Sequence, residues 1–555
     1  MRISLAVAIL FLSGPALAQQ GAACHKGHME AGYKMTPMPP PKLMQSIGTS
    51  SLKITTKSPE AQAYFSQGLA LTHCFWDFEA YRAFKEAARL DPDAPMALWG
   101  IVESIKEYPA MEEETKAARE KIRKLLDRAS EHEKYYLRAQ QKQADGKPYL
   151  QEIEAIVENY PDDLDAQAFL GLWTMHGYDE DGKPRAGQAE ARALLEKLLL
   201  LHPDHAAANH YLIHVVEMGP HPEYALHSAD VLAKLAPASG HMVHMPGHIY
   251  FKMGDQDRAR EAFLAAMHVE EEYMQRESVS VVDNWNYSHN ISYLIASDAE
   301  AGRYKEALAM AEKLDHLPVV TARAVASPRF AIKEGSTTAR LQIRFGKWQD
   351  VAEHPIVLGD DALAGEPARA YRDGILAYAA GMSALEKKDL ESAARQSDRL
   401  DALQFRLKTA ELDPKENGNA NGVLNLLERD SLDLRGGIEC AKGDLDAGVK
   451  LLRQAADVER KKVGYAEPPA YGKPESESIG YAYLAAGQFD HARAAFEEEL
   501  KIRPKSGHAL YGIALAYERE GDKAQASQAY ARFLDSWKNA DPDLPMVQHA
   551  KSRRE

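Results

Sequence analysis

Histidine is the residue type whose number and spacing most directly suggest chemistry in this sequence. Eleven of the chain's 21 histidines fall within the 88 residues 202–289. Imidazole acts as a general acid or base near neutral pH and is also the commonest metal ligand in proteins. Two pairs in this stretch have a spacing of four, His210 with His214 and His244 with His248. Such a spacing places both rings of a pair on the same face of a helix.

Several other kinds of chemistry have no support in the sequence. The formal net charge of −15 and the pI near 5.8 argue against nucleic-acid binding, which needs a basic footprint. The chain has no Gly-rich phosphate loop and no Gly-x-Ser-x-Gly motif. It also lacks the His-Glu-x-x-His zinc-protease motif, because Tyr211 stands where the glutamate of the first pair would be.

The N-terminus has the pattern of a cleavable secretory signal. Arg2 precedes the apolar run 3–12, and Ser13-Gly14-Pro15 then separates this run from Ala16-Leu17-Ala18. A charged start, a short apolar core and an Ala-x-Ala site predict cleavage after Ala18. Because nothing in the mature part is apolar enough to span a membrane, we expect a soluble periplasmic or secreted protein with a bacterial type of signal.

Residues 19–58 are expected to form an unstructured lead-in, because four prolines between 37 and 41 oppose a helix. This segment holds soft metal ligands beside imidazole: Cys24, His25, His28, Met29, Met35, Met38 and Met44. Thiolate, thioether and imidazole groups suit Cu(I), although a floppy linker with chance methionines is the simpler interpretation.

The chain has three cysteines, Cys24, Cys74 and Cys440. Because the count is odd, at least one thiol is left without an intramolecular partner, and no disulfide framework supports the fold. Cys74 lies at the end of an expected helix, so we interpret it as a core residue and not as a nucleophile.

A 34-residue helical repeat begins at about residue 59. With Gly68 at position eight, small, aromatic and proline residues fall at positions 20, 24, 27 and 32, namely Ala80, Phe84, Ala87 and Pro92. Two units near the C-terminus repeat the pattern with Gly480, Tyr483, Ala492, Phe496, Pro504, Ala514, Tyr517, Ala526 and Tyr530. On these residues the chain resembles the tetratricopeptide-repeat (TPR) family. The resemblance implies an all-α superhelical solenoid built from antiparallel helix pairs.

The repeat frame also predicts the domain organisation. We expect a signal peptide at 1–18, the lead-in at 19–58, and an N-terminal TPR array with a histidine-rich groove at 59–320. Irregular helical repeats with inserted loops follow at 321–470, a C-terminal TPR pair at 471–540, and a polar tail at 541–555.

In this frame the histidines recur at matched positions. A unit that starts at Ala206 has His210 and His214 at positions five and nine, and Glu217 at position twelve. The next unit starts at Gly240, and the one after it starts at Ser288 behind a 14-residue insertion. These two units place His241, His244 and His248 at positions two, five and nine, and His289 at position two.

The resemblance implies that this face of the first helices lines the concave groove of the solenoid. Neighbouring helices pack about 8–10 Å apart, so imidazoles from two of them can meet at one ion about 2.0–2.1 Å away. We therefore predict a transition-metal site formed by His210, His214, His244 and His248. Glu217, His241 and His289 are auxiliary members of the site; Glu217 could bind the ion, orient an imidazole or act as a base.

Pro246 bears on His241, because a proline inside a helix removes one hydrogen bond. We expect the helix to start near Val243, which would put His241 outside it. Other histidines of the stretch are expected in loops or on the surface, namely His202, His205, His221, His227 and His268. The polar and aromatic segment 283–290 suits a pocket wall, although a capped insertion is an alternative.

The identity of the metal stays open among copper, zinc, iron and nickel, with copper slightly favoured by the lead-in. Whether such a site is catalytic, structural or metal-handling also stays open. The alternative is a metal-free TPR scaffold whose concave groove captures a peptide or partner protein.

Residues 209–250 further resemble a group of bacterial TPR proteins of unassigned function. These proteins carry similar Asn-His-Tyr-x-x-His and His-x-x-His-Met-Pro-x-His-Ile-Tyr segments. The resemblance implies an exported subgroup with histidine-rich central repeats, but it implies no reaction.

Overall fold

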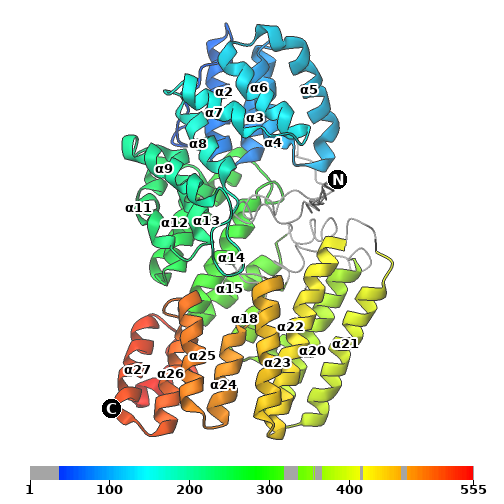
Figure 1. Ribbon diagram of the computed structural model, residues 1–555, viewed down its shortest axis with the longest axis vertical. Helices are drawn as coiled ribbons and strands as arrows, with labels where there is room; N and C mark the ends of the chain where they lie inside the picture. Colours follow the sequence, from blue (N-terminus) through cyan, green and yellow to red (C-terminus); the bar gives the residue numbers. More distant parts are fainter. Residues whose placement is uncertain are drawn as a thin grey trace, which may run out of the picture.

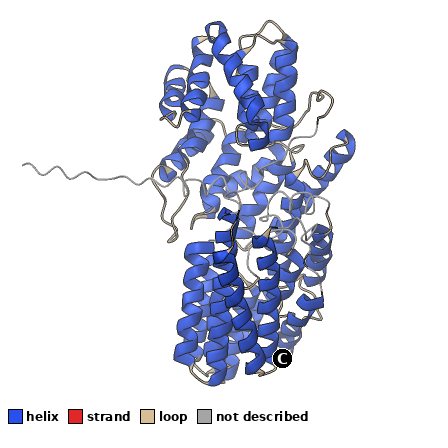
Figure 2. Ribbon diagram, turned by 90° about the vertical axis from the view of Figure 1, so that its right-hand side faces the viewer, coloured by secondary structure: helices blue, strands red, loops and turns tan. Residues whose placement is uncertain are grey.

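The computed structural model describes residues 37–317, 336–353, 356, 365–412, 417–463 and 472–553. These residues form helices joined by short turns and contain no β-strand (Figure 2). Successive helices pack beside one another in an elongated superhelical array (Figure 1). The predicted all-α solenoid is therefore confirmed.

The N-terminal half of the array contains the expected helix pairs. Its first part, at the top of Figure 1, comprises α2 (Pro59–His73), α3 (Asp77–Leu90), α4 (Pro95–Ile105), α5 (Glu112–Leu125), α6 (Glu131–Ala144), α7 (Leu150–Asn159), α8 (Leu164–Thr174) and α9 (Gln188–Leu201). The histidine-rich part follows as α10 (Ala206–Glu217), α11 (Leu226–Leu235), α12 (Gly240–Lys252), α13 (Gln256–Glu277), α14 (Trp285–Glu300) and α15 (Tyr304–Asp315).

The remaining helices occupy the lower half of Figure 1. The segment that was expected to be irregular contains α18 (Thr337–Arg344), α19 (Trp348–Glu353), α20 (Glu366–Glu386), α21 (Leu390–Thr409), α22 (Asn417–Lys442) and α23 (Leu445–Val458). The C-terminal helices are α24 (Glu475–Ala485), α25 (Phe489–Ile502), α26 (Gly507–Glu520), α27 (Lys523–Ser536) and α28 (Pro545–Ser552).

The small and aromatic repeat positions interlock as the sequence frame requires. A Cβ atom at Gly68 would lie 2.7 Å from the ring of Phe84, and one at Gly480 would lie 2.6 Å from the ring of Phe496. At both places the aromatic ring of the second helix fills the space that the missing side chain leaves on the first helix. These contacts confirm the frame at both ends of the array.

The C-terminal repeats pack onto the histidine-rich part and share its hydrophobic core. The indole Nε1 of Trp537 donates to the carbonyl oxygen of Glu300 at 2.8 Å, and the amide of Asp541 donates to Gly302 at 3.0 Å. A second core lies between residues 339 and 438 and belongs to the segment that was expected to be irregular. Of residues 413–422, which were expected to form a polar loop, 413–416 lie outside the described residues and 417–422 form the first turns of α22.

The lead-in is helix-free over residues 37–58, but it is not the loose segment that was expected. Ile47, Leu52 and Ile54 are buried in the main core. The side chain of Gln67 bonds to the amide of Met44 at 2.6 Å, and Glu133 accepts from the amide of Thr55 at 2.6 Å. Because helical side chains satisfy its backbone, this stretch stays extended and ordered against α2 and α6.

Two further terminal segments were singled out by the sequence. The expected signal 1–18 and the ligands Cys24, His25, His28, Met29 and Met35 lie outside the described residues, whereas Met38 and Met44 pack against the core. The expected polar tail contains α28, whose Val547 and Ala550 are buried, so apolar spacing extends the array by one helix. None of the described helices combines the length and the apolar character needed to cross a bilayer.

Candidate metal centre

The histidine cluster forms where the first helices of three successive repeats stack. His210, His214 and Glu217 lie on α10, three further histidines lie on α12, and His289 lies on α14. The exposed fraction of each of these side chains is at most 4%, except for the partly exposed His289. This face was expected to line the concave groove, but most of these side chains are instead packed inside the solenoid, in a cluster that we call the histidine chamber.

The six histidines of the predicted site divide into two trios. The first trio is His210, His214 and His241, and the second is His244, His248 and His289. Within each trio, one ring nitrogen of each residue lies within 4.8 Å of those of the other two.

This division corrects the sequence prediction that His210, His214, His244 and His248 surround one ion. Each trio combines the pair at positions five and nine of one repeat with the residue at position two of the next repeat. Each pair stays together within one trio, but His241 and His289, which were expected to be auxiliary, complete the two sets.

His241 belongs to the helix despite Pro246. Helix α12 runs from Gly240 to Lys252 through Pro246, and the hydroxyl of Ser239 at its N-cap accepts from the amide of Met242 at 3.5 Å. The expected start near Val243 was wrong, since the missing proline amide removes a single hydrogen bond without ending the helix. His241 consequently projects from the first turn toward α10.

The hydrogen bonds of the first trio fix which nitrogen of each ring carries the proton. His210 Nδ1 lies 2.7 Å from the carbonyl oxygen of His73, and His214 Nδ1 lies 2.7 Å from Glu217 Oε1. A carbonyl and a carboxylate only accept, so both Nδ1 atoms must donate. With both Nδ1 atoms committed as donors, the Nε2 atoms of His210 and His214 face each other 3.0 Å apart.

His241 adds a third ring nitrogen, its Nε2, to the place where His210 Nε2 and His214 Nε2 meet. Its Nε2 lies 3.1 Å from His210 Nε2, while its Nδ1 lies 3.3 Å from Asn286 Oδ1. Asn286 Nδ2 donates to Glu270 Oε1 at 2.6 Å, which turns the amide oxygen toward His241. Three nitrogen ligands at 2.0–2.1 Å from a tetrahedral ion would be about 3.3 Å apart, close to the spacings seen here.

Burial keeps two of these rings, His210 and His241, neutral. Loss of solvation, together with the neighbouring imidazoles, lowers the pKa of His210 and of His241 well below the usual value for histidine. Protonation of these two rings therefore does not relieve the repulsion between their facing Nε2 lone pairs, whereas a bound cation would.

The second trio has a related arrangement. His244 Nε2 lies 2.6 Å from His248 Nε2, and His248 Nδ1 lies 2.5 Å from Glu217 Oε2. The carboxylate again requires a proton on Nδ1, so His248 Nε2 is the nitrogen that faces His244. The ring of His289 lies 4.7 Å from that of His244, and burial lowers the pKa of His244 well below its usual value.

Glu217 joins the two trios. Its two oxygens accept from His214 of one trio and from His248 of the other. Burial alone would raise the pKa of this carboxyl, but the charges and hydrogen bonds of the two imidazoles lower it, so the group is ionised. Of the three roles that the sequence left open for Glu217, these contacts support the orientation of imidazoles.

Glu270 supports the amide that contacts His241. Its carboxylate accepts from Asn284 Nδ2 and Asn286 Nδ2, and burial raises its pKa to about 7. A Cβ atom at Gly240 would lie 1.8 Å from Glu270 Oε1, so only glycine leaves room for this carboxyl below the first turn of α12.

Aromatic rings close the chamber. Phe75, in the turn between α2 and α3, stacks on His214 at 5.1 Å and lies 4.7 Å from His210 between ring centres. Tyr293 packs 4.4 Å from His248, and Trp285 lies 5.6 Å from His241. These rings exclude water from the imidazoles and lower the local dielectric constant.

Residues from the first repeat were missed by the sequence reasoning. His73 contributes a carbonyl oxygen, and Phe75 contributes its ring from a backbone with φ of 53°. A non-glycine residue in the left-handed region is uncommon and often marks a functional site, but φ is not visible in a sequence. By contrast, segment 283–290 was singled out as a candidate pocket wall, and two of its residues, Trp285 and Asn286, contact His241.

The remaining histidines of the stretch lie outside both trios, as predicted. His202, His221, His227 and His268 are exposed, and the His205 ring caps α10 by accepting from the amide of Ala208 at 3.2 Å. Cys74 is a core residue, as expected, because it is fully buried, its Sγ donates to the Ile47 carbonyl, and burial raises its pKa to about 12.

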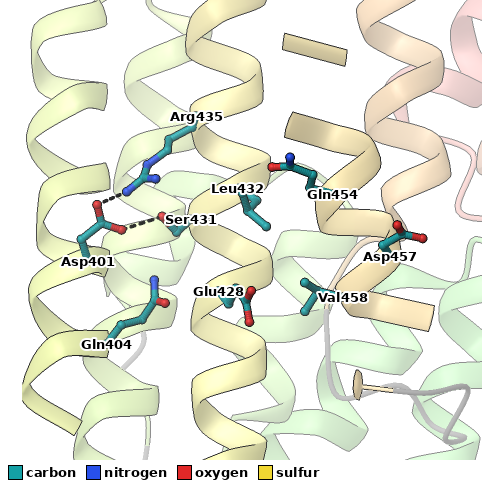
Figure 3. A pocket seen from close by; sticks show the side chains of 9 residues that line it. All are labelled: Asp401, Gln404, Glu428, Ser431, Leu432, Arg435, Gln454, Asp457 and Val458. Carbon is teal, nitrogen blue, oxygen red and sulfur yellow. Dashed lines mark hydrogen bonds and ion pairs between the residues drawn. The ribbon is translucent and has the colours of Figure 1, made fainter. Parts of the chain in front are cut away.

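A separate groove of about 390 Å³ lies between α21, α22 and α23 (Figure 3). Asp401 forms an ion pair with Arg435 at its rim and accepts from the Ser431 hydroxyl at 2.9 Å. The groove shares no residue with the histidine chamber, and its charged rim is already paired.

Comparisons with known proteins bear on the repeats. The family model described as tetratricopeptide repeat matches residues 242–272 and 477–506, which fall on α12–α13 and α24–α25. No curated protein matches the chain.

Solved structures of low similarity match most of the chain. The Cut9–Hcn1 hetero-tetramer of the APC/C is 14% identical with a TM-score of 0.28, over 88% of this chain and 76% of that chain. The human IFIT1 dimer with m7Gppp-AAAA is 12% identical with a TM-score of 0.33, over 88% and 91%. Yeast Tom70 is 14% identical with a TM-score of 0.28, over 89% and 95%. On the family matches, the chain contains tetratricopeptide repeats, and one of them carries His244 and His248.

Proposed function

We propose that this chain is an exported bacterial TPR protein whose buried histidine chamber binds a transition metal. The observation that carries the proposal is the facing of His210 Nε2 and His214 Nε2 at 3.0 Å, with both Nδ1 atoms donating to acceptors. Export rests on the signal pattern of residues 1–18.

The arrangement has the hydrogen-bonding pattern of a metal site. Histidine ligands usually donate their second nitrogen to a carboxylate or carbonyl group, which fixes the ring and leaves the other lone pair for the metal. Here Glu217, the His73 carbonyl and Asn286 take those roles. Without a cation, the buried Nε2 lone pairs of His210 and His241 would face each other at 3.1 Å with no proton between them, which is unfavourable.

Copper is the metal that we propose first. Imidazole nitrogens suit copper, zinc, iron and nickel, and copper(II) stands highest in affinity among the divalent ions of this series. The soft ligands Cys24, His25 and Met29 of the lead-in also suit copper. Zinc and iron are the alternatives.

The enclosure of the chamber favours a resident ion over one that is passed on rapidly. Five of the six imidazoles are buried, and Phe75 covers the first trio. An open fourth ligand position would make a metalloenzyme, whereas a closed set would make a structural or metal-handling site. The alternative function is a metal-free scaffold that binds a peptide or protein, and the same experiment tests it.

Elemental analysis of the full chain, exported to a bacterial periplasm and purified without chelators, tests the proposal. We expect bound metal in the wild type, its loss in the double variant His214→Ala/His248→Ala, and its retention in the control His227→Ala. His227 is an exposed histidine in the same repeat as His214.

Two results would contradict the proposal. A folded wild-type chain that neither carries metal nor takes it up on reconstitution would leave the scaffold function. Metal that persists in a folded double variant would place the ligands elsewhere. Circular dichroism of each variant establishes that the chain is folded.

A further inference from the structure

We propose that the chamber is a dinuclear centre, with one metal ion in each histidine trio and Glu217 between them. This inference rests on the proposed metal-binding function and extends it from a single site to a pair of sites.

The first argument is the separation of the ligand atoms. Ligands 2.0–2.1 Å from one ion lie at most about 4.2 Å from one another. Among the described residues, imidazoles whose nitrogens all lie within 4.8 Å of one another, already a looser limit, fall into two sets of three with no ring in common. A single ion therefore cannot use all six rings in this arrangement, and either trio alone leaves the other three rings unexplained.

The second argument is that the same construction occurs twice. In the first trio, the pair on α10 is completed by the position-two histidine of α12; in the second, the pair on α12 is completed by that of α14. Successive repeats are related by nearly the same rotation and translation, so an equivalent residue set builds an equivalent site. Duplication of the whole ligand set points to duplication of the ion.

The third argument is the placement of charge between the trios. The rings of His241 and His244 are 6.0 Å apart and nearly parallel, so the two sites are neighbours. Two cations in a buried chamber repel each other strongly. The Glu217 carboxyl group contacts one ring of each trio and so lies where its charge would offset that repulsion for both ions.

Each ion would have three protein ligands in this arrangement. Three-histidine sites keep a further position for a small ligand, as catalytic sites do. Because the trios adjoin, those positions belong to one chamber, which suits a small molecule or anion that contacts both ions.

Copper titration of the full-length apoprotein tests the pairing. We expect two Cu(II) ions per chain in the wild type and in the control His227→Ala. We expect one ion in His210→Ala and one in His289→Ala, because each variant removes a ligand from a different trio. The double variant His210→Ala/His289→Ala should bind no ion at the concentrations that saturate the two single variants.

Electron paramagnetic resonance provides a second readout, which can be applied to the wild type itself. Two neighbouring Cu(II) ions interact magnetically, so the fully loaded wild type should show a broadened or lost isolated-copper signal. The signal should return as that of a single uncoupled ion in His289→Ala.

The outcomes separate this inference from the function beneath it. One tightly bound, uncoupled ion in the wild type would overturn the dinuclear centre and leave the proposed metal function standing. No bound ion would overturn both. Two ions that persist in folded His289→Ala with unchanged affinity would refute the assignment of ligands to trios.

Discussion

Glutamine at position 217 would keep the shape of the side chain and replace one acceptor oxygen by a donor. The glutamate accepts from His214 Nδ1 at 2.7 Å and from His248 Nδ1 at 2.5 Å. A glutamine can accept from only one of these rings. The other ring must either lose its partner or move its proton to Nε2, where the proton blocks the lone pair that would bind metal.

The expected loss can be worked from these contacts. Removing the hydrogen-bond partner of a histidine ligand typically weakens metal binding about 10–100-fold, which corresponds to about 1.4–2.7 kcal/mol. A hydrogen bond to a charged group contributes about 1.5–3 kcal/mol, a similar magnitude. We therefore expect Glu217→Gln to weaken one ion about 10–100-fold, and to weaken the other less, through loss of the carboxylate charge.

Competition against a chromophoric copper chelator measures both affinities. Glu223→Gln is the matched control, since the Glu223 carboxylate also accepts from a histidine, at 3.0 Å from His221 Nδ1, but on the exposed surface. If folded Glu217→Gln binds both ions with wild-type affinity while Glu223→Gln does the same, the proposed role of the carboxylate is refuted.

Three further predictions concern the fold and its titratable groups. Gly247→Ala should lower the free energy of unfolding by about 1–3 kcal/mol, measured by thermal or chemical unfolding, because the new Cβ would lie 2.3 Å from the ring of Phe263. Gly422→Ala is the control: this residue is exposed, its Cβ would have nothing within 4 Å, and alanine should stabilise its helix. Burial raises the pKa of Glu270 to about 7 from an unfolded value of about 4.3, so its contribution to stability is largest below about pH 4.3 and falls as pH rises toward 7, by roughly 3–4 kcal/mol at most. Urea unfolding of the metal-free chain at pH 5 and pH 8 should show a smaller loss in Glu270→Gln than in the wild type, and equal losses would contradict this assignment. Native alkylation at pH 8, mapped by mass spectrometry, should modify half-buried Cys440 slowly and leave Cys74 intact until the chain unfolds, because burial raises the pKa of the Cys74 thiol to about 12; rapid labelling of Cys74 in the folded chain would count against its place in the core.

The sequence predicted those parts of the site that depend on local spacing. Helical periodicity placed His210 with His214, and His244 with His248, because four residues make about one turn. The small and aromatic repeat positions fixed the stacking of the helices that carry them, as the contact of Gly68 with Phe84 shows. The fold class followed from the same pattern.

The partition into trios depends on the relative rotation of neighbouring helices, which spacing within one helix does not determine. His241 was set aside because of Pro246, yet the Ser239 cap and the following turns hold the helix through that residue. Phe75 reaches the chamber from a repeat more than 130 residues earlier, and only the curvature of the whole array brings it there. Contacts at such sequence separation leave no local signal.

Helix α12 contributes histidines to both trios and so links three consecutive repeats. In an ordinary repeat array each unit contacts its neighbours alone, and stability spreads along the chain as a series of adjacent interfaces. Here α10, α12 and α14 must keep their positions relative to one another. Each trio spans the interface between two of these helices, and both trios include residues of the middle helix. Loss of the middle repeat would remove imidazoles from both trios at once, so these three repeats form one block.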